Sequence, residues 1–379
     1  MADSRNIAAA EEAERRVRDL FAAHEFRHVA PPLLQPAAPF VDLSGEDIRN
    51  RLYLVSGPDG GELCLRPDFT IPVALDHLAA GHTTPTAYSY VGTVVRHRAG
   101  ASPEFLQAGV ESFGRPDAAE ADADILALGL EALRRLDAER VTLRIGDRSL
   151  FAAFVQALDV PPAWAERLKR HFGRAEDFRD DLEQLEALVR ASGGPSEAFL
   201  NVLGGGDQAA ARAVVEDLLA LAGIASIGGR TAGDIAERFL EQAALSATSL
   251  GAAELALLRQ FVSVSAPPWR ALDTLYELAR DGGVALDRAL EALAERLQLL
   301  AERDVDLDGA TFATAFGRRL DYYTGFVFEA HEPGALVLGQ VLGGGRYDGL
   351  LSFLGSREPI PAVGCAIWVE RTPLWRRLR

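Results

Sequence analysis

Hydrophobic and polar residues alternate with a period of two along residues 105–113, which read Phe-Leu-Gln-Ala-Gly-Val-Glu-Ser-Phe. Successive side chains of a β-strand point to opposite faces, so Gln107, Gly109 and Glu111 share one face with the two terminal phenylalanines. The opposite face is almost wholly apolar and is expected to bury a core. A solvated outer face would explain the polar positions equally simply, but it would leave the side chains of Phe105 and Phe113 exposed to water. We therefore expect this face to line a ligand site.

The same periodicities predict helices and strands along most of the chain. We expect helices at 8–24, 68–80, 118–136 and 284–303, and strands at 88–96, 105–113, 141–145, 321–330, 335–342 and 362–367. Residues 51–55 and 62–65 flank a Gly-Pro-Asp-Gly-Gly turn and predict a hairpin. Most consecutive strands have links of hairpin length, which favours an antiparallel sheet flanked by helices and an α+β fold.

The pattern of hydrophobic and polar residues changes between about residues 150 and 255, where helical periodicity dominates. Gly/Pro clusters at 193–195 and 204–206 punctuate this region. We expect one core formed by residues 1–150 and 285–379, with a mainly helical insertion at 151–284.

Composition restricts the function. Hydrophobic residues make up 48% of the chain and charged residues 25%, so a large core can form. The net charge of −16 makes nucleic acid a poor default partner, because binding it relies on neutralising phosphates. The polar N-terminus predicts no signal peptide, and no apolar run is long enough to span a membrane. A cytoplasmic protein is expected.

Metal and cofactor chemistry finds little support in the sequence. The seven histidines are scattered without metal-ligand spacing, and the two cysteines, Cys64 and Cys365, lie in apolar surroundings typical of buried thiols. We expect no metal, no cofactor and no disulfide. No nucleophile motif is present, so no catalytic residue is predicted.

Two further polar clusters are candidates for a binding site. Arg318 and Arg319 precede a predicted strand with adjacent tyrosines, Tyr322 and Tyr323, of which only one can easily line a given pocket. Aromatic core packing explains this segment equally well. A glycine turn at 343–345 leads into a second cluster, but it fits neither a Walker loop nor a dinucleotide fingerprint, and a plain strand-to-helix turn remains an alternative.

Five segments in sequence order resemble histidyl-tRNA synthetase, a class II aminoacyl-tRNA synthetase. They are Leu65–Thr70, Arg96–Gly114, Arg318–Glu329, Gly344–Gly349 and Ala362–Arg371, the second and last of which resemble motifs 2 and 3. The resemblance implies an antiparallel sheet flanked by helices, a self-dimer formed through motif 1, and a pocket for L-histidine. The histidine-binding positions that it implies are Asp68, Thr70, Arg96, Gln107, Glu111, Arg318, Tyr322, Tyr323 and Tyr347.

Three departures separate this chain from an active synthetase. The sequence ends at Arg379, directly after motif 3, so no anticodon-binding domain is expected. The motif 2 loop at 97–103 is short and lacks an acidic residue. Trp368 occupies a position where the family carries a glycine that lets adenine approach the backbone, and an indole there would fill that space.

A synthetase core with these losses resembles the regulatory subunit of the short-form ATP phosphoribosyltransferase. That branch implies a non-catalytic chain that activates a catalytic subunit, mediates histidine feedback inhibition in the first step of histidine biosynthesis, and joins a hetero-octamer of four chains of each kind. No tRNA and no membrane partner are expected. One alternative is a truncated enzyme that still adenylates histidine, and another is a plain histidine-binding module. The sequence leaves open whether effector histidine uses the inherited pocket or an interface site.

Overall fold

The chain folds into two units. The computed structural model describes residues 4–57, 60–82, 84–191, 226–227, 230–231, 233, 241, 244–245, 250–318, 322–333 and 339–378. The first unit comprises Met1–Leu150, Val264–Glu277 and Asp287–Arg379, and the second comprises Phe151–Ser263 and Leu278–Leu286. The predicted turns at 193–195 and 204–206 lie outside the described residues.

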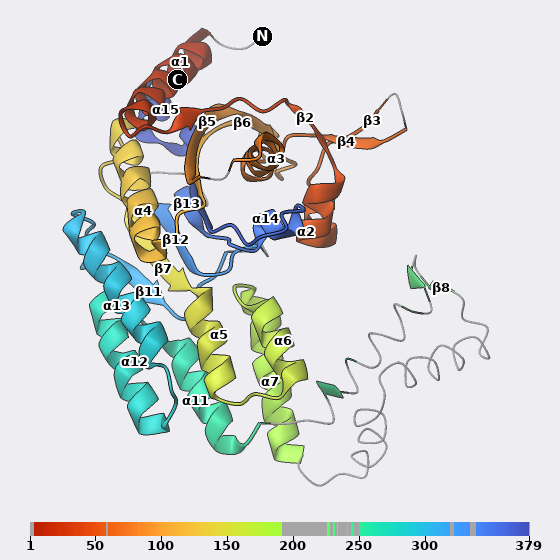
Figure 1. The fold of residues 1–379 in the computed structure, drawn as a ribbon, viewed down its shortest axis with the longest axis vertical. Coiled ribbons are helices and arrows are strands. Elements are labelled where there is room, and N and C mark those ends of the chain that lie inside the picture. Colours follow the sequence, from red (N-terminus) through yellow and green to blue (C-terminus); the bar gives the residue numbers. More distant parts are fainter. Residues whose placement is uncertain are drawn as a thin grey trace. The chain divides into compact units, whose positions relative to one another are not determined.

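A mixed sheet forms the centre of the first unit (Figure 1). Its strand order is β1-β5-β6-β14-β13-β12-β7-β11-β10. The bounds are β1 Arg27–His28, β5 Thr86–Val95, β6 Glu104–Phe113, β7 Thr142–Asp147, β10 Ser265–Ala266, β11 Thr311–Ala313, β12 Phe326–His331, β13 Gln340–Arg346 and β14 Ala362–Trp368. Among the strands that the structure describes, only β1 with β5 and β11 with β7 pair in parallel. The predicted α+β class is therefore confirmed, with two short parallel pairs added.

Helices cover this sheet. They are α1 Ser4–Ala23, α2 Ala38–Arg49, α3 Thr70–Ala80, α4 Ala118–Arg135, α13 Asp287–Glu302, α14 Leu350–Phe353, the 3-10 turn η1 Val369–Arg371 and α15 Pro373–Leu378. Helix α4 packs closely on β13 and β14, since a Cβ atom added at Gly129 would lie 3.1 Å from the Cys365 sulfur (Figure 1). Both cysteines are free, and both are buried as their apolar surroundings predict.

A buried ionic network fastens α4 to the sheet and to α13. Asp122, which has no exposed surface, accepts hydrogen bonds from Arg296 at 2.8 Å and Arg346 at 2.9 Å. Arg296 also donates to Asp147 at 3.1 Å. Each buried charge thus has a partner of opposite sign, which is the condition under which charges are tolerated in a core.

A small antiparallel sheet has the strand order β2-β4-β3 and contains the predicted hairpin. Helix α2 lies between β2 and β3 in the sequence. The strands of this sheet are β2 Leu34–Pro36, β3 Leu54–Ser56 and β4 Glu62–Leu65. Among the described residues of both units, no helix is both long and apolar enough to cross a bilayer.

The second unit is mainly helical where it is described. Its helices are α6 Pro162–His171, α7 Ala175–Ala191 and α11 Ala252–Ser263, with a two-stranded ladder of β8 Ser226–Ile227 and β9 Arg230–Thr231. Helices α5 Arg148–Ala157 and α12 Pro268–Gly282 each continue from one unit into the other. Stacked rings of Phe154 and Phe261, 4.0 Å apart, form part of its core.

Two element predictions were wrong in an informative way. The glycine run at 343–345 is no turn but the middle of β13, where a Cβ atom at Gly344 would lie 2.3 Å from the backbone oxygen of Gly364. These glycines allow strands to approach, which is the other common use of glycine in a sheet. The strand expected at 321–330 begins only at Phe326, and residue 321 lies outside the described residues, as do positions 335–338 of the strand expected at 335–342.

Candidate functional site

All nine residues predicted for the histidine site line one cavity in the first unit. The remaining lining residues are Gly343, Gly364, Cys365, Ala366 and Trp368. The space open to the centre of a water-sized sphere is about 40 Å³.

The strand β6 supplies Gln107 and Glu111 from the face that the alternation predicted. Both are almost fully buried, at 3% and 1% exposed. The neighbouring strands leave space for them, because β14 presents Gly364 opposite Glu111. A Cβ atom at Gly364 would lie 1.7 Å from a Glu111 carboxylate oxygen.

Glu111 is held by hydroxyl groups, and it forms no ion pair with a cation among the described residues. The Thr70 hydroxyl at the start of α3 donates to it at 2.7 Å, the Tyr90 hydroxyl from β5 donates at 3.2 Å, and the Tyr347 hydroxyl donates to its other oxygen. Burial raises the pKa of Glu111 to about 7, although the three hydroxyl hydrogen bonds act in the opposite direction. The site therefore gains most from a ligand group that carries a positive charge.

Asp68 and Arg96 lie at another part of the cavity wall. Burial raises the pKa of Asp68, and the positive charge of Arg96 opposes this rise. Burial likewise lowers the pKa of Arg96 to about 10, and Asp68 opposes that change. Each charge thus compensates part of the other's desolvation.

Three tyrosine rings form the aromatic side of the cavity. The centroids of Tyr322 and Tyr323 lie 4.9 Å apart, and Tyr347 lies 5.6 Å from the first and 6.2 Å from the second. The expectation that only one of the adjacent tyrosines could line the pocket was wrong. It assumed a strand, whereas Tyr322 and Tyr323 precede β12 and escape its alternation.

Two buried polar atoms in the cavity wall have no hydrogen-bond partner among the described residues. They are the Gln107 amide oxygen, which is an acceptor, and the Arg318 Nε atom, which is a donor. Buried groups of this kind are usually satisfied, so each is a candidate contact for a ligand. An acceptor on Gln107 and a donor on Arg318 suit a zwitterion, because its ammonium group donates hydrogen bonds and its carboxylate accepts them.

Trp368 forms a further part of the wall and ends β14 in register with Gln107. The indole is 9% exposed, and the Arg371 guanidinium lies 5.1 Å from its ring centroid. Arg371 also donates to the backbone oxygen of Gln340 at 2.8 Å. Both side chains are thus committed to contacts within the chain.

The groups in this cavity wall suit the binding of a charged ligand. Cys365 lies in the wall, but burial raises the pKa of its thiol far above the ordinary range, so it is no nucleophile at neutral pH. Within the part of the chain that the structure describes, no group of histidine, cysteine or carboxylate side chains could hold a metal ion. Two carboxylates, two guanidiniums and three phenols can instead bind a zwitterion with a polar ring.

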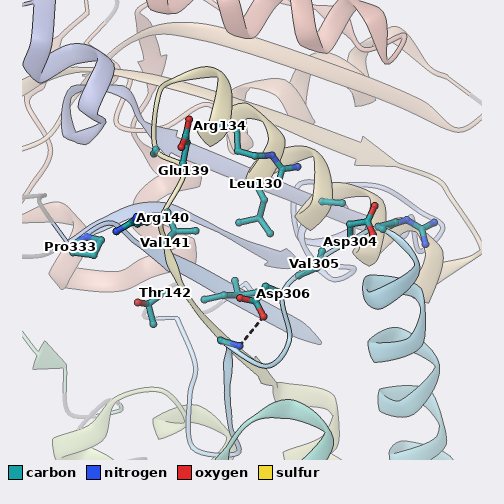
Figure 2. A pocket seen from close by; sticks show the side chains of 15 residues that line it. Leu130, Arg134, Glu139, Arg140, Val141, Thr142, Asp304, Val305, Asp306 and Pro333 are labelled. Carbon is teal, nitrogen blue, oxygen red and sulfur yellow. Dashed lines mark hydrogen bonds between the residues drawn. The ribbon is translucent and has the colours of Figure 1, made fainter.

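A second, larger cavity of about 350 Å³ lies elsewhere in the first unit and contains none of the predicted residues. Figure 2 shows it between the end of α4, the start of β7 and the loop after α13. Its charged side chains, among them Arg134, Glu139, Arg140 and Asp304, are exposed to solvent and mixed in sign. Solvent screens such groups, so the smaller cavity with its buried charges is the stronger candidate despite its size.

The sequence analysis missed Tyr90 and the roles of Gly343 and Gly364. The hydroxyl of Tyr90 reaches Glu111 because Gly109, its register partner on β6, has no side chain to block the path. A Cβ atom at Gly109 would lie 2.4 Å from that hydroxyl oxygen. The pairing of an aromatic residue with a glycine on the next strand was the only signal available.

Comparison with known proteins places this site in context. The sequence profile described as histidyl-tRNA synthetase matches residues 2–227 and 235–372. A protein of Agrobacterium fabrum (strain C58), named ATP phosphoribosyltransferase regulatory subunit, is 40% identical over 358 residues, covering 93% of each chain. A protein of the same name from Brucella ovis is 39% identical over 350 residues, covering 92% of this chain and 93% of that one.

Solved structures agree on the fold. An ATP phosphoribosyltransferase regulatory subunit/histidyl-tRNA synthetase from Bacillus halodurans superposes with a TM-score of 0.65 at 19% identity, covering 98% of this chain and 80% of that one. A histidyl-tRNA synthetase from Nostoc sp. PCC 7120 gives a TM-score of 0.61 at 19% identity, covering 97% and 70%.

Proposed function

Because this chain belongs to the ATP phosphoribosyltransferase regulatory subunits of the histidyl-tRNA synthetase family, we propose that it binds L-histidine and transmits feedback inhibition to a catalytic partner. The observation that carries the proposal is the buried carboxylate of Glu111, surrounded by hydroxyls inside a cavity that also holds Arg96 and Arg318. An amino acid supplies the missing cation and an anion together.

The proposed contacts follow the charges of the cavity. Asp68, Thr70, Gln107 and Glu111 would receive the ammonium group. Arg318 would take the carboxylate, with Arg96 completing the charge balance near Asp68. The three tyrosines would surround the imidazole ring, whose nitrogens can exchange hydrogen bonds with phenol hydroxyls.

A regulatory role requires that histidine bind two states of the chain unequally, because a ligand shifts an equilibrium between two states only under that condition. We propose that histidine favours one state of the cavity wall and that the catalytic partner responds to that change.

The self-dimer, which the resemblance assigns to motif 1, is proposed here to include the small sheet in its interface. Leu34 and Val55 share one face of β2-β4-β3, since they pair with Leu65 and Leu63 on β4, and Tyr53 directly precedes β3. Each of these three side chains is 37–49% exposed. An exposed apolar face of this kind marks an interaction site. The occupant we propose is a second copy of this chain. Two such dimers with four catalytic chains would give the hetero-octamer.

The runner-up, a truncated enzyme that adenylates histidine, is disfavoured by Trp368. The indole belongs to the cavity wall, and Arg371 is engaged with it and with the Gln340 backbone. An ATP–pyrophosphate exchange assay with L-histidine separates the two functions. We expect no exchange above background, and robust exchange would establish the enzyme instead.

An assay with the catalytic partner distinguishes a regulatory subunit from a plain histidine-binding module. Adding this chain to a short-form ATP phosphoribosyltransferase catalytic subunit should raise its turnover, and L-histidine should then inhibit the mixture. Co-purification of the two chains is the accompanying expectation. Histidine binding by calorimetry without any effect on turnover would support the plain module.

A further inference from the structure

Arg318 is the most constrained cation of the cavity wall. Its side chain is 9% exposed, and one terminal nitrogen, Nη1, donates to Glu329 at 3.1 Å. Its guanidinium carbon lies 5.6 Å from the ring centroid of Tyr323. The Nε atom on the same planar group is buried without a partner among the described residues. The guanidinium is therefore engaged by Glu329 and by a side-chain hydrogen bond with Tyr323, while its Nε donor has no partner among the described residues.

Gly343 determines where this guanidinium can lie. A Cβ atom added at Gly343 would lie 1.7 Å from Arg318 Nη1 and 2.4 Å from the central carbon. The nearest atoms all belong to the end of the Arg318 side chain, so an alanine would displace that side chain rather than the backbone. Gly343 is thus a positioning residue for Arg318.

Glu329 fixes the guanidinium from the neighbouring strand. It is the register partner of Gly343 across β12 and β13, so the two residues share a face of the sheet. Its second carboxylate oxygen lies 3.2 Å from His331 Nε2, which keeps the carboxylate from turning away. Glu329 also neutralises part of the charge that Arg318 could offer to a ligand.

We infer that Arg318 is a shared cation, whose position is set by Gly343 and whose hold on a ligand carboxylate is limited by Glu329. The inference rests on the proposed function, namely that an amino acid binds in this cavity. A second anion close to Arg318 experiences repulsion from Glu329 at short range in a poorly solvated site. An effector site benefits from this limit, because a sensor must release its ligand when the concentration falls.

The test compares two ligands that differ in one group. L-histidine and L-histidinamide share the ammonium and the ring, but the amide lacks the carboxylate. Calorimetry gives the affinities of L-histidine and L-histidinamide for the wild-type chain and for G343A, E329Q and E332Q. Competition titrations replace direct titrations where binding is weak. Glu332 is the matched control. It lies on the same segment as Glu329, but its carboxylate pairs with Arg376 at 2.7 Å and not with Arg318.

The two variants should act in opposite directions, and only on the ligand with a carboxylate. G343A should weaken L-histidine about tenfold by displacing Arg318. E329Q, which keeps a hydrogen-bond acceptor but removes the charge, should tighten L-histidine about tenfold. Neither variant should change L-histidinamide appreciably, and E332Q should change neither ligand. Thermal melting checks that each variant is folded.

The outcomes separate this inference from the proposed function. If the wild type binds both ligands but the variants shift them equally, or E329Q fails to tighten L-histidine, the shared role of Arg318 is wrong and the histidine site stands. If the wild type binds neither ligand, both the site and the inference are overturned. A merely structural role would weaken both ligands in both variants.

Discussion

Replacing Glu111 with glutamine removes the one fully buried negative charge of the cavity and leaves its shape intact. The glutamine keeps an oxygen that can accept from Thr70 and Tyr90, and its amide nitrogen can donate to the Tyr347 hydroxyl. The fold should survive, because no hydroxyl loses every partner. Histidine binding should not survive, because the ammonium group loses its carboxylate.

The size of the effect follows from burial. Glu111 is 1% exposed, so an ion pair formed there is largely desolvated. Truncating one partner of such a pair costs about 2–5 kcal/mol, or roughly 30- to 5,000-fold in affinity. Part of this is offset in the wild type, whose Glu111 has a pKa of about 7 and must be ionised before it binds a cation. We expect a loss of at least about tenfold.

Isothermal titration of L-histidine into the wild type, E111Q and E104Q measures this loss. Glu104 begins the same strand but is exposed, so its replacement controls for a charge change on β6. An E111Q variant that binds L-histidine within about threefold of the wild type would refute the reasoning, since that is less than about 1 kcal/mol. Histidine would then bind elsewhere, for instance at a subunit interface.

Three further predictions concern stability and assembly. The pKa of Glu111 is raised from 4.5 to about 7 in the folded chain, so its contribution is full below about pH 4.5 and is lost as the pH rises through 7. The unfolding free energy of the wild type relative to E111Q should therefore fall by about 3 kcal/mol between pH 4.5 and 8 in urea titrations, and a pH-independent difference would contradict the shift. Asp122→Ala should lower the unfolding free energy by about 3–5 kcal/mol, because Arg296 and Arg346 lose a buried partner, and a loss below about 1 kcal/mol would show that water replaces the carboxylate. Val55→Glu should convert the self-dimer to monomer in sedimentation velocity without lowering the melting temperature, and an unchanged sedimentation coefficient would place the dimer interface elsewhere.

The polar face of β6 was predictable because it depends on local geometry alone. Alternation along residues 105–113 places Gln107 and Glu111 on one face wherever that strand lies in the sheet. The helix at 118–136 was predictable for the same reason, since its apolar stripe repeats with the helical period. The family resemblance then supplied the other candidate residues, which periodicity could not connect.

The errors arose where local rules were applied to residues placed by distant partners. The glycines at 343–345 were taken for a turn because glycine favours turns in isolation. In the folded chain, β12 and β14 lie against both edges of that segment and Arg318 covers Gly343, so the absence of side chains serves close packing. Tyr322 and Tyr323 line one cavity together because the strand begins after them.

The sequence by itself determined the fold class, the face of β6 and the residue types of the candidate site. Only the tertiary structure decided that Glu111 is satisfied by three hydroxyls and that Glu329 pairs with Arg318 at the cavity wall. The physical reason is that hydrogen bonds and ion pairs depend on atoms brought together from strands far apart in the chain. Periodicity records which face a side chain occupies, and it carries no information about what lies opposite that face.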